Sequence, residues 1–249
     1  MMLISTNAIV LKSIPYGDSS IICRLFTEDQ GKITVMAKGA WKPKKTTGPL
    51  LEPMNQIHLQ YYNKNSRDIQ ILKDAELIRI FSILRSDLNR IILGQVVVEA
   101  IDKSTQINNS LPIIYRLGWR VLDKMNHADV NHWLVFAFYL YQLSMRLGFM
   151  PNLKTCCQCK SVFRDAFIDD MIGELICHEC SPKSKISLSK KSLIFLQKLA
   201  YLHLDDIHPG MSNTAEIYPV LRFLQIFICI HIDGINRVRS LEMIHKLLI

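Results

Sequence analysis

Four cysteines, arranged in two pairs, are the residues of this chain whose types and spacing best suit a defined chemistry. Cys156 and Cys159 form one C-x2-C pair, Cys177 and Cys180 form the other, and 17 residues separate the pairs. Each pair lets two thiolates converge on one ion, and two pairs complete the tetrahedron that structural Zn²⁺ prefers. Four thiolates leave no open position for a catalytic water. The spacing therefore predicts one structural Zn²⁺ per chain, with a lost site or a redox pair as alternatives.

The other three of the seven cysteines have different predicted roles. Cys157 would form only a cramped chelate with Cys159, and Cys23 and Cys229 lie in apolar runs typical of small buried side chains. His178 is interpreted as a polar turn residue, with a spare metal ligand as the alternative. The odd number of cysteines, and an amino terminus without a charged segment before a long apolar one, favour a reduced, cytoplasmic protein.

Length and charge narrow the class of protein further. A chain of 249 residues suits one large or two to three small domains. A net charge of +8 indicates a polyanionic partner. The longest apolar runs, residues 133–143 and 220–232, are too short to span a membrane and are predicted to be buried helices.

The first 77 residues carry the pattern of short strands. Residues rich in Ile, Val, Leu, Thr and Tyr, with turn residues between them, mark strands at 6–13, 19–27, 32–37, 56–62 and 69–77. Five short strands suit a small closed barrel, of which the five-stranded OB-fold is the commonest, and an SH3-like barrel has a similar pattern. We therefore predict an OB-fold domain over residues 1–77.

From residue 78 the apolar period becomes helical. Apolar residues recur at three- and four-residue steps from Ile80 to Ile92. Further helices are predicted at 111–124, 130–147, 188–202, 218–232 and 241–248, with Ser187 and Ser189 as candidate caps of the helix that begins near 188. The predicted fold class is α+β: an OB-fold barrel, then a mostly helical domain over 78–249 with a zinc module inserted at 151–182.

A basic loop on the predicted barrel is the strongest candidate for ligand binding. Between residues 32 and 45 the chain has five lysines and no acidic residue, with an aromatic side chain among them. Lysines neutralise phosphates and an indole stacks on a base, so this region predicts single-stranded nucleic-acid binding; the alternative is a solvated loop with its tryptophan packed on the barrel. With two cations from the predicted strands, the candidate DNA-binding residues are Lys12, Arg24, Lys32, Lys38, Trp41, Lys42, Lys44 and Lys45.

The sequence lacks three common enzymatic motifs. The sequence has no phosphate-binding loop, no dinucleotide fingerprint and no G-x-S-x-G nucleophile motif. The acid pairs at 169–170 and 205–206 are interpreted as solvated turns. A second acid-free stretch, residues 181–204, contains five lysines and is interpreted as a solvated helix face. The protein is therefore predicted to have no catalytic residues, and a zinc-dependent hydrolase is disfavoured because four thiolates close the metal site.

Several motifs are shared with a known family. They are residues 8–12 (AIVLK), 16–20 (YGDSS), 25–32 (LFTEDQGK) and 37–40 (AKGA), followed by the proline–leucine lead into the two cysteine pairs. This series resembles the RecO family of bacterial recombination mediators and DNA-repair proteins. The sequence departs from the family pattern at Asp18 and Ser20, where glutamate and aspartate are expected.

The resemblance implies a fold and a set of partners. It implies an OB-fold followed by a helical, zinc-bearing domain that binds single- and double-stranded DNA, anneals complementary strands and helps load RecA onto DNA coated with single-stranded DNA-binding protein. RecR, the carboxy-terminal tail of single-stranded DNA-binding protein, RecF and RecA are the implied partners, at the bacterial nucleoid. A general RNA-associated OB protein with a zinc ribbon is the competing hypothesis.

Overall fold

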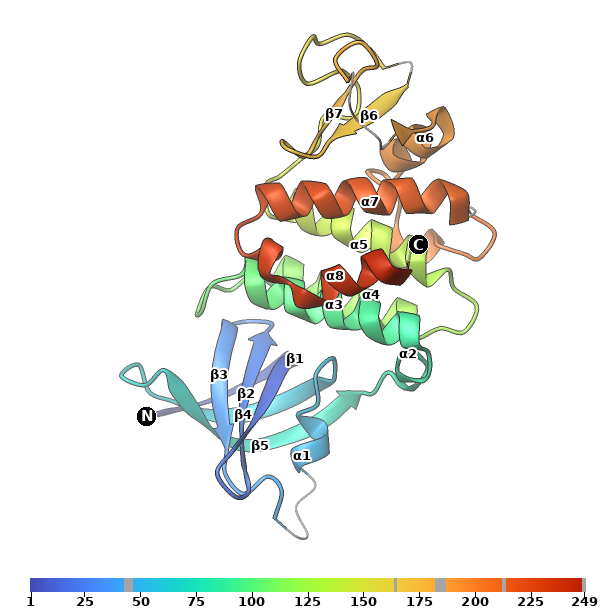
Figure 1. The fold of residues 1–249 in the computed structure, drawn as a ribbon. Helices are drawn as coiled ribbons and strands as arrows, with labels where there is room; N and C mark the ends of the chain where they lie inside the picture. The colour runs from blue at the N-terminus through green and yellow to red at the C-terminus, as the bar shows by residue number, and fades with distance from the viewer. Residues whose placement is uncertain (43–46, 164, 182–186, 212–213, 248–249) are drawn as a thin grey trace. The chain divides into compact units, whose positions relative to one another are not determined.

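The computed structural model of the chain describes residues 1–42, 47–163, 165–181, 187–211 and 214–247 (Figure 1). The chain divides into two compact units, Met1–Asn126 and His127–Ile249. The first contains a barrel and four helices, and the second contains the remaining helices and the cysteine-bearing module. Three of the helices after residue 78 therefore group with the barrel.

The amino-terminal sheet closes on itself as predicted. Its strands are β1 (Met2–Tyr16), β2 (Ser20–Thr27), β3 (Gly31–Ala37), β4 (Gln56–Asn63) and β5 (Ile69–Arg79). They form a closed barrel in the order β1-β2-β3-β5-β4, in which β1 also pairs with β4 and only the β3–β5 pair is parallel. The short helix α1 (Thr47–Leu50) comes between β3 and β4. This is an OB-like barrel, which confirms the predicted fold class.

Alternation along the strands decides which side chains fill the barrel. Ile21, Cys23 and Leu25 of β2 are buried in the barrel core, together with Val10 and Val35 from the neighbouring strands. Successive side chains of a strand point to opposite faces. The intervening side chains of β2 therefore lie on the outside of the barrel, where the helices of the first unit cover part of it.

Three helices follow the barrel strands in the first unit: α2 (Ser82–Ser86), α3 (Leu88–Ser104) and α4 (Pro112–Met125). Both α3 and α4 pack against β1. Gly118 permits this approach, because a Cβ atom there would lie 2.7 Å from Ile101 Cδ1 and 3.1 Å from Ile9 Cδ1.

A buried lysine joins the barrel to the end of α3. Lys32 is only 8% exposed, and its Nζ donates hydrogen bonds to the backbone carbonyls of Asp102 and Thr105. Its Nζ also lies 3.6 Å from the Asp102 carboxylate, which accepts from Arg24 Nη1 at 2.8 Å. The last carbonyls of a helix lack internal partners and attract cations. Lys32 therefore serves as a cap of α3, and burial lowers its pKa against the opposing charge of Asp102.

A second buried cation caps the carboxy-terminal end of α4 in the same way. Arg90 is 8% exposed, and its Nη1 donates to the carbonyl of Met125 at 2.6 Å. At the other end of α3, the Asp87 side chain accepts from the Arg90 backbone amide at 2.9 Å and caps the helix.

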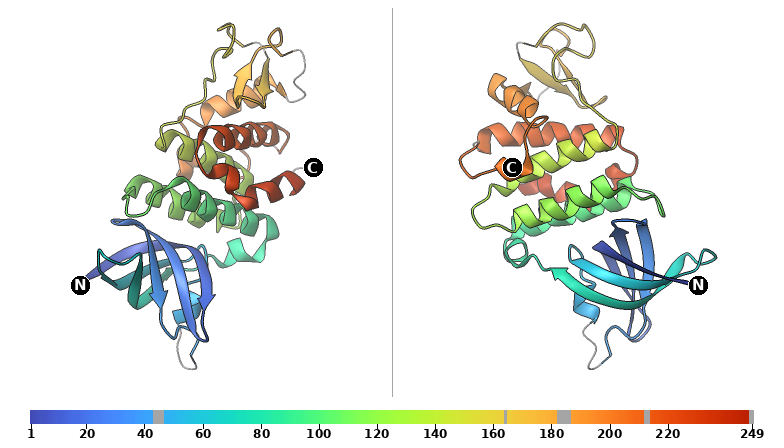
Figure 2. Two further views of the ribbon diagram at one scale, coloured as in Figure 1. Left: turned by 60° about the vertical axis from the view of Figure 1, so that its left-hand side comes forward. Right: turned by 180° about the vertical axis from the view of Figure 1, so that it is seen from behind.

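The second unit contains helices and a small sheet, which Figure 2 shows from two further sides. Its helices are α5 (His132–Arg146), α6 (Lys190–Lys198), α7 (Thr214–His231) and α8 (Arg239–Leu247), with 3-10 turns η1 (Leu204–Asp206) and η2 (Ile235–Arg237). Helix α7 packs against both α5 and α6. The sheet has the order β7-β6-β8, with β6 at Ala166–Asp169, β7 at Glu174–Ile176 and β8 at Ser187–Leu188.

One local prediction for this unit is confirmed. Ser189 caps α6, since its side chain accepts from the Ser192 amide at 3.1 Å. Across the described residues, no helix combines the length and the apolar character needed to cross a bilayer.

We expect Lys32→Met to lower the free energy of unfolding by about 1–3 kcal/mol, because it leaves buried carbonyls without their donor. The matched variant Lys38→Met removes an exposed lysine of the same region and should change stability by no more than about 0.5 kcal/mol. Urea unfolding of the full chain measures both. Equal effects of the two substitutions would contradict the capping role of Lys32.

Candidate metal centre and nucleic-acid interface

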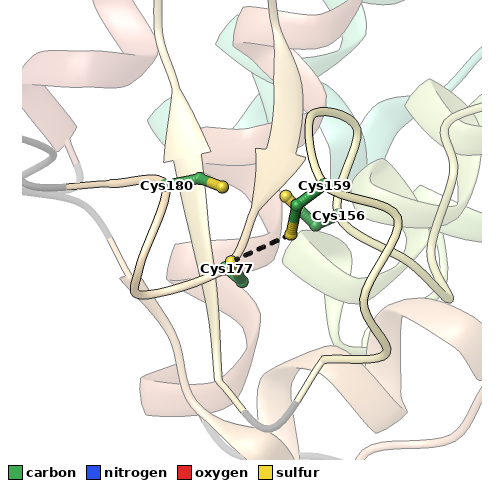
Figure 3. Close-up of side chains that lie close together, drawn as sticks. All are labelled: Cys156, Cys159, Cys177 and Cys180. Carbon is green, nitrogen blue, oxygen red and sulfur yellow. Dashed lines mark hydrogen bonds between the residues drawn. The ribbon is translucent and has the colours of Figure 1, made fainter.

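The structure brings the four predicted cysteines together. The Sγ atoms of Cys156, Cys159, Cys177 and Cys180 all lie within 4.8 Å of one another. Figure 3 shows the four side chains converging from two segments of the module. The Sγ atoms of Cys159 and Cys177 are 3.6 Å apart, which is too far for a disulfide at about 2.05 Å. It is close to the roughly 3.8 Å edge of a tetrahedron with Zn–S bonds of about 2.3 Å.

Tight turns orient the two thiols of each pair toward the centre of the cluster. In the first turn, the Cys156 amide donates to the Ser161 carbonyl at 2.8 Å and the Lys160 amide donates to the Cys156 carbonyl at 3.0 Å. Lys160 takes a left-handed backbone conformation with φ of 63°. The second pair follows β7 directly, and there the Ser181 amide donates to the His178 carbonyl at 3.1 Å. The sheet thus positions Cys177, and the turns place the partners of each pair.

Electrostatics within the cluster favour a bound cation. Hydrogen bonds from Ser161 lower the pKa of the Cys159 thiol to about 6. Hydrogen bonding with Cys159 and Cys177 raises the pKa of the Cys180 thiol to about 12. Four thiols this close cannot all ionise alone, whereas a divalent metal ion neutralises their charge and deprotonates coordinating thiols. The donor set and its geometry fit Zn²⁺.

The apolar core of the module is small. Cys156, Ile176 and Cys177 are its buried members, and Phe163 and Phe167 pack partly against them. Cys157 is half-buried beside this core and is not a member of the four-thiol group. His178 packs edge-on against Phe167, with ring centroids 5.7 Å apart. A core of this size supports the view that metal coordination stabilises the module.

Two lysines and the tryptophan of the predicted basic loop are exposed. Lys38 and Lys42 are exposed, and Trp41 is 53% exposed. Part of the indole packs on α1, because a Cβ atom on Gly48 would lie 2.6 Å from Trp41 Cε3. Lys44 and Lys45 lie outside the described residues. The indole is thus held against α1 along one edge while about half of the residue's surface faces solvent.

The other predicted DNA-binding residues differ in exposure and in whether the side chain already has a partner within the chain. Lys12 is exposed and pairs in register with Arg24 across β1 and β2. Arg24 is held by Asp102 through two hydrogen bonds of 2.8 and 3.0 Å. Lys32 is buried under the end of α3 and its ammonium is committed there. Because this ammonium is already hydrogen-bonded beneath α3, we propose that Lys32 serves the fold and that DNA binding falls to the other residues of the predicted set.

Sequence reasoning missed a basic stripe on α4. Arg116, Arg120 and Lys124 recur every four residues, so they lie on one face of that helix. Arg116 and Arg120 are exposed. The four-residue spacing was a readable signal, but the apolar residues between these cations dominated the interpretation of the segment.

It also missed a serine–histidine–asparagine network on the barrel. Ser5 Oγ lies 2.8 Å from His58 Nε2, and His58 Nδ1 lies 2.9 Å from Asn7 Oδ1. Asn7 and His58 are register partners of β1 and β4, fifty-one residues apart in sequence. The network links two strands of the barrel, and Ser5 is exposed on the sheet surface.

A closed OB-like barrel, followed by helices and a four-cysteine cluster that suits a metal ion, defines the class of protein. The comparisons with known proteins specify the class. Residues 1–81 match the family model "Recombination protein O N terminal" and residues 85–242 match "Recombination protein O C terminal". This chain belongs to the RecO family of DNA repair proteins.

Individual relatives agree with this assignment. The chain is 27% identical to "DNA repair protein RecO" of Pelodictyon phaeoclathratiforme, over all of both chains. It is 30% identical to the protein of the same name from Syntrophotalea carbinolica, over 79% of this chain and 76% of the relative. The protein of that name from Salinibacter ruber is 36% identical, over 60% of this chain and 57% of the relative.

We expect protein purified without chelator to contain one Zn²⁺ per chain. Cys177→Ser should reduce the metal content well below one and lower the melting temperature, because it removes a ligand from a module with little core of its own. Cys157→Ser is the matched control and should keep the metal, since Cys157 stands outside the cluster. Elemental analysis measures the content, and a parent protein without metal would contradict the assignment.

Proposed function

We propose that this chain is a recombination mediator without catalytic residues. It binds single- and double-stranded DNA, anneals complementary strands without ATP, and helps load RecA onto DNA coated with single-stranded DNA-binding protein. RecR, and RecF with it, are its proposed partners, in the bacterial cytoplasm at the nucleoid. Membership of the RecO family supports this proposal.

The structural observation that carries the proposal is the group of Lys38, Trp41 and Lys42 on the OB-like barrel. All three side chains are exposed, and they follow β3 within five residues. Cations beside an indole suit a single strand, because charge neutralises phosphates and the ring stacks on any base. The net charge of +8 also draws two polyanionic strands to one protein and lowers their mutual repulsion.

A cavity in the second unit suits the tail of single-stranded DNA-binding protein. An acidic, apolar-ended tail needs an apolar pocket with lysine or arginine at its rim. A cavity of about 250 Å³ has apolar walls that include Phe195 and Leu199, and Lys191 and Lys198 also line it. Its acidic lining residue, Glu216, already has an interaction within the chain. Both lysines are exposed on α6. The predicted solvated helix face is therefore our proposed site for this tail.

An experiment can distinguish the proposed mediator from an RNA-associated binding protein. A passive RNA binder prefers RNA and does not accelerate pairing, whereas a mediator accelerates the pairing of complementary DNA. A zinc-dependent hydrolase is disfavoured because the four-thiol set leaves the metal without an open position.

We expect the affinity for single-stranded DNA to fall with salt, at a log–log slope of about 0.7 per phosphate contact. The triple variant Lys42→Glu, Lys44→Glu, Lys45→Glu should weaken binding and flatten the slope by up to about 2, three times the value for one contact. Fluorescence anisotropy of a labelled oligonucleotide over a salt series measures both quantities.

A charge-matched triple variant controls for net charge. Lys154→Glu, Lys190→Glu and Arg237→Glu change exposed residues of the second unit and should leave the slope close to that of the parent. If this control weakened binding as much as the loop variant, the barrel loop would lose its assignment and the helical region would take its place.

Trp41→Ala should lower the affinity for single-stranded DNA by roughly 1–3 kcal/mol while the salt slope stays the same, because stacking involves no counterion release. Equilibrium binding of the full chain at two salt concentrations separates the two effects. A parallel change in slope would show that the indole acts by positioning the neighbouring lysines.

We expect the protein to anneal labelled complementary strands in the absence of nucleotide, and to do so faster on strands coated with intact single-stranded DNA-binding protein than on strands coated with a tail-truncated form. Lys191→Glu with Lys198→Glu should remove that difference and leave the annealing of bare strands unchanged. Equal rates on both coats in the parent would remove the tail assignment. No acceleration on bare strands would leave a passive binder.

A further inference from the structure

A second cavity, of about 320 Å³, lies in the second unit beside α7. Residues of η2, α8 and the β6–β7 turn complete its lining. Its walls are largely aliphatic and include Ile226, Ile230 and Leu241, and Ile230 is 43% exposed. Its volume is at the lower end for ligand pockets, which suits one or two side chains of a partner.

The lining includes a polar group whose hydrogen-bonding capacity is unused. Gln225 is only 2% exposed, and among the described residues neither its Nε2 nor its Oε1 has a hydrogen-bond partner. A buried amide without partners lowers stability. An adjacent donor and acceptor on one planar group are complementary to the carbonyl and the N–H of a peptide group. The cavity therefore offers a hydrogen-bonding pair that the chain itself does not satisfy.

The charges around the cavity select among ligands. Asp170 and Glu242 line it, and Arg222 is the one cation of that lining and already has an interaction within the chain. Two carboxylates against one engaged arginine disfavour a phosphate and favour a lysine or arginine beside the ligand's apolar group. This rim is opposite in sign to that of the cavity lined by Lys191 and Lys198.

We propose that the cavity beside Gln225 is a docking site for a short segment of a partner protein, in which a large apolar side chain stands next to a lysine or arginine. The apolar side chain enters the cavity, the Gln225 amide pairs with the segment's backbone, and Asp170 and Glu242 face its cation. This site is separate from the one proposed for the acidic tail, and it does not depend on the annealing function.

The first test compares two buried glutamines in the full chain. Gln225→Leu should raise the melting temperature by about 2–4 °C, because it removes an unpaired amide from an apolar wall. Gln142→Leu is the matched control and should lower the melting temperature, since Gln142 donates to the Leu199 carbonyl at 3.4 Å and accepts from Arg146. A fall in both variants would show that Gln225 is a structural residue and would overturn the proposal.

The second test selects binders from a display library of random heptapeptides, using the parent protein as bait. We expect the selected peptides to place a large apolar residue next to lysine or arginine. Gln225→Leu and the exposed charge reversal Glu242→Lys should each reduce their affinity at least tenfold, while Lys191→Glu should leave it unchanged. Selected peptides that are acidic, or that bind equally to the Gln225→Leu variant, would overturn the proposal.

Cys229 reports occupancy of the cavity directly. Its thiol lines the cavity and is half-buried, and burial raises its pKa. A selected peptide should slow alkylation of Cys229 at least tenfold, as measured by mass spectrometry of the peptide that contains it. An oligodeoxynucleotide should give no protection. Protection by the oligonucleotide and none by the peptide would make the cavity a nucleobase site and overturn the peptide assignment.

Discussion

The ammonium of Lys32 is the constraint on which the architecture of the first unit depends. It comes from the start of β3, reaches the last carbonyls of α3 and shares Asp102 with Arg24. A buried cation is tolerated only when hydrogen bonds and an opposite charge compensate for lost hydration. Removing either side leaves charged or polar groups unpaired. The barrel and α3 are therefore joined by a specific polar contact as well as by apolar packing.

The second unit depends on a different kind of constraint. Its module has a core of a few residues, so the four thiolates must supply what apolar burial cannot. The same module contributes Asp170 to the cavity beside Gln225. Gly173, in the same turn, has a left-handed φ of 71°, and a Cβ atom there would lie 3.1 Å from Ile230 Cδ1. The turn of the module therefore packs closely against the Ile230 wall of that cavity.

Local patterns were sufficient for much of the fold and for the metal site. The five strands were predicted within a few residues, because alternation and turn chemistry are short-range signals. β1 extends beyond the predicted residues 6–13 at both ends, where Met2 pairs with Asn63 of β4 and Tyr16 pairs with Ser20 of β2. The spacing of the two C-x2-C pairs is enough by itself to predict a cluster of four thiols. The role of Lys32 was not predictable, because its partners lie 70 and 73 residues further along the chain. The local sequence around a lysine in a basic run is the same whether its side chain faces solvent or caps a helix.

The same limit applies to Gln225, whose neighbours in sequence are apolar and whose empty hydrogen-bonding capacity appears only when α7, η2 and α8 are assembled. Natural cores rarely keep an unpaired amide where leucine would fit, because an unpaired buried amide lowers the stability of the fold. Its presence in the wall of a cavity, beside two carboxylates, is explained by a partner that satisfies it. The role proposed for this chain, recognition of DNA and of several proteins, needs surfaces of opposite charge, because one uniform field cannot discriminate among such ligands. The lysine-lined cavity beside α6 and the carboxylate-lined cavity beside α7 meet that requirement.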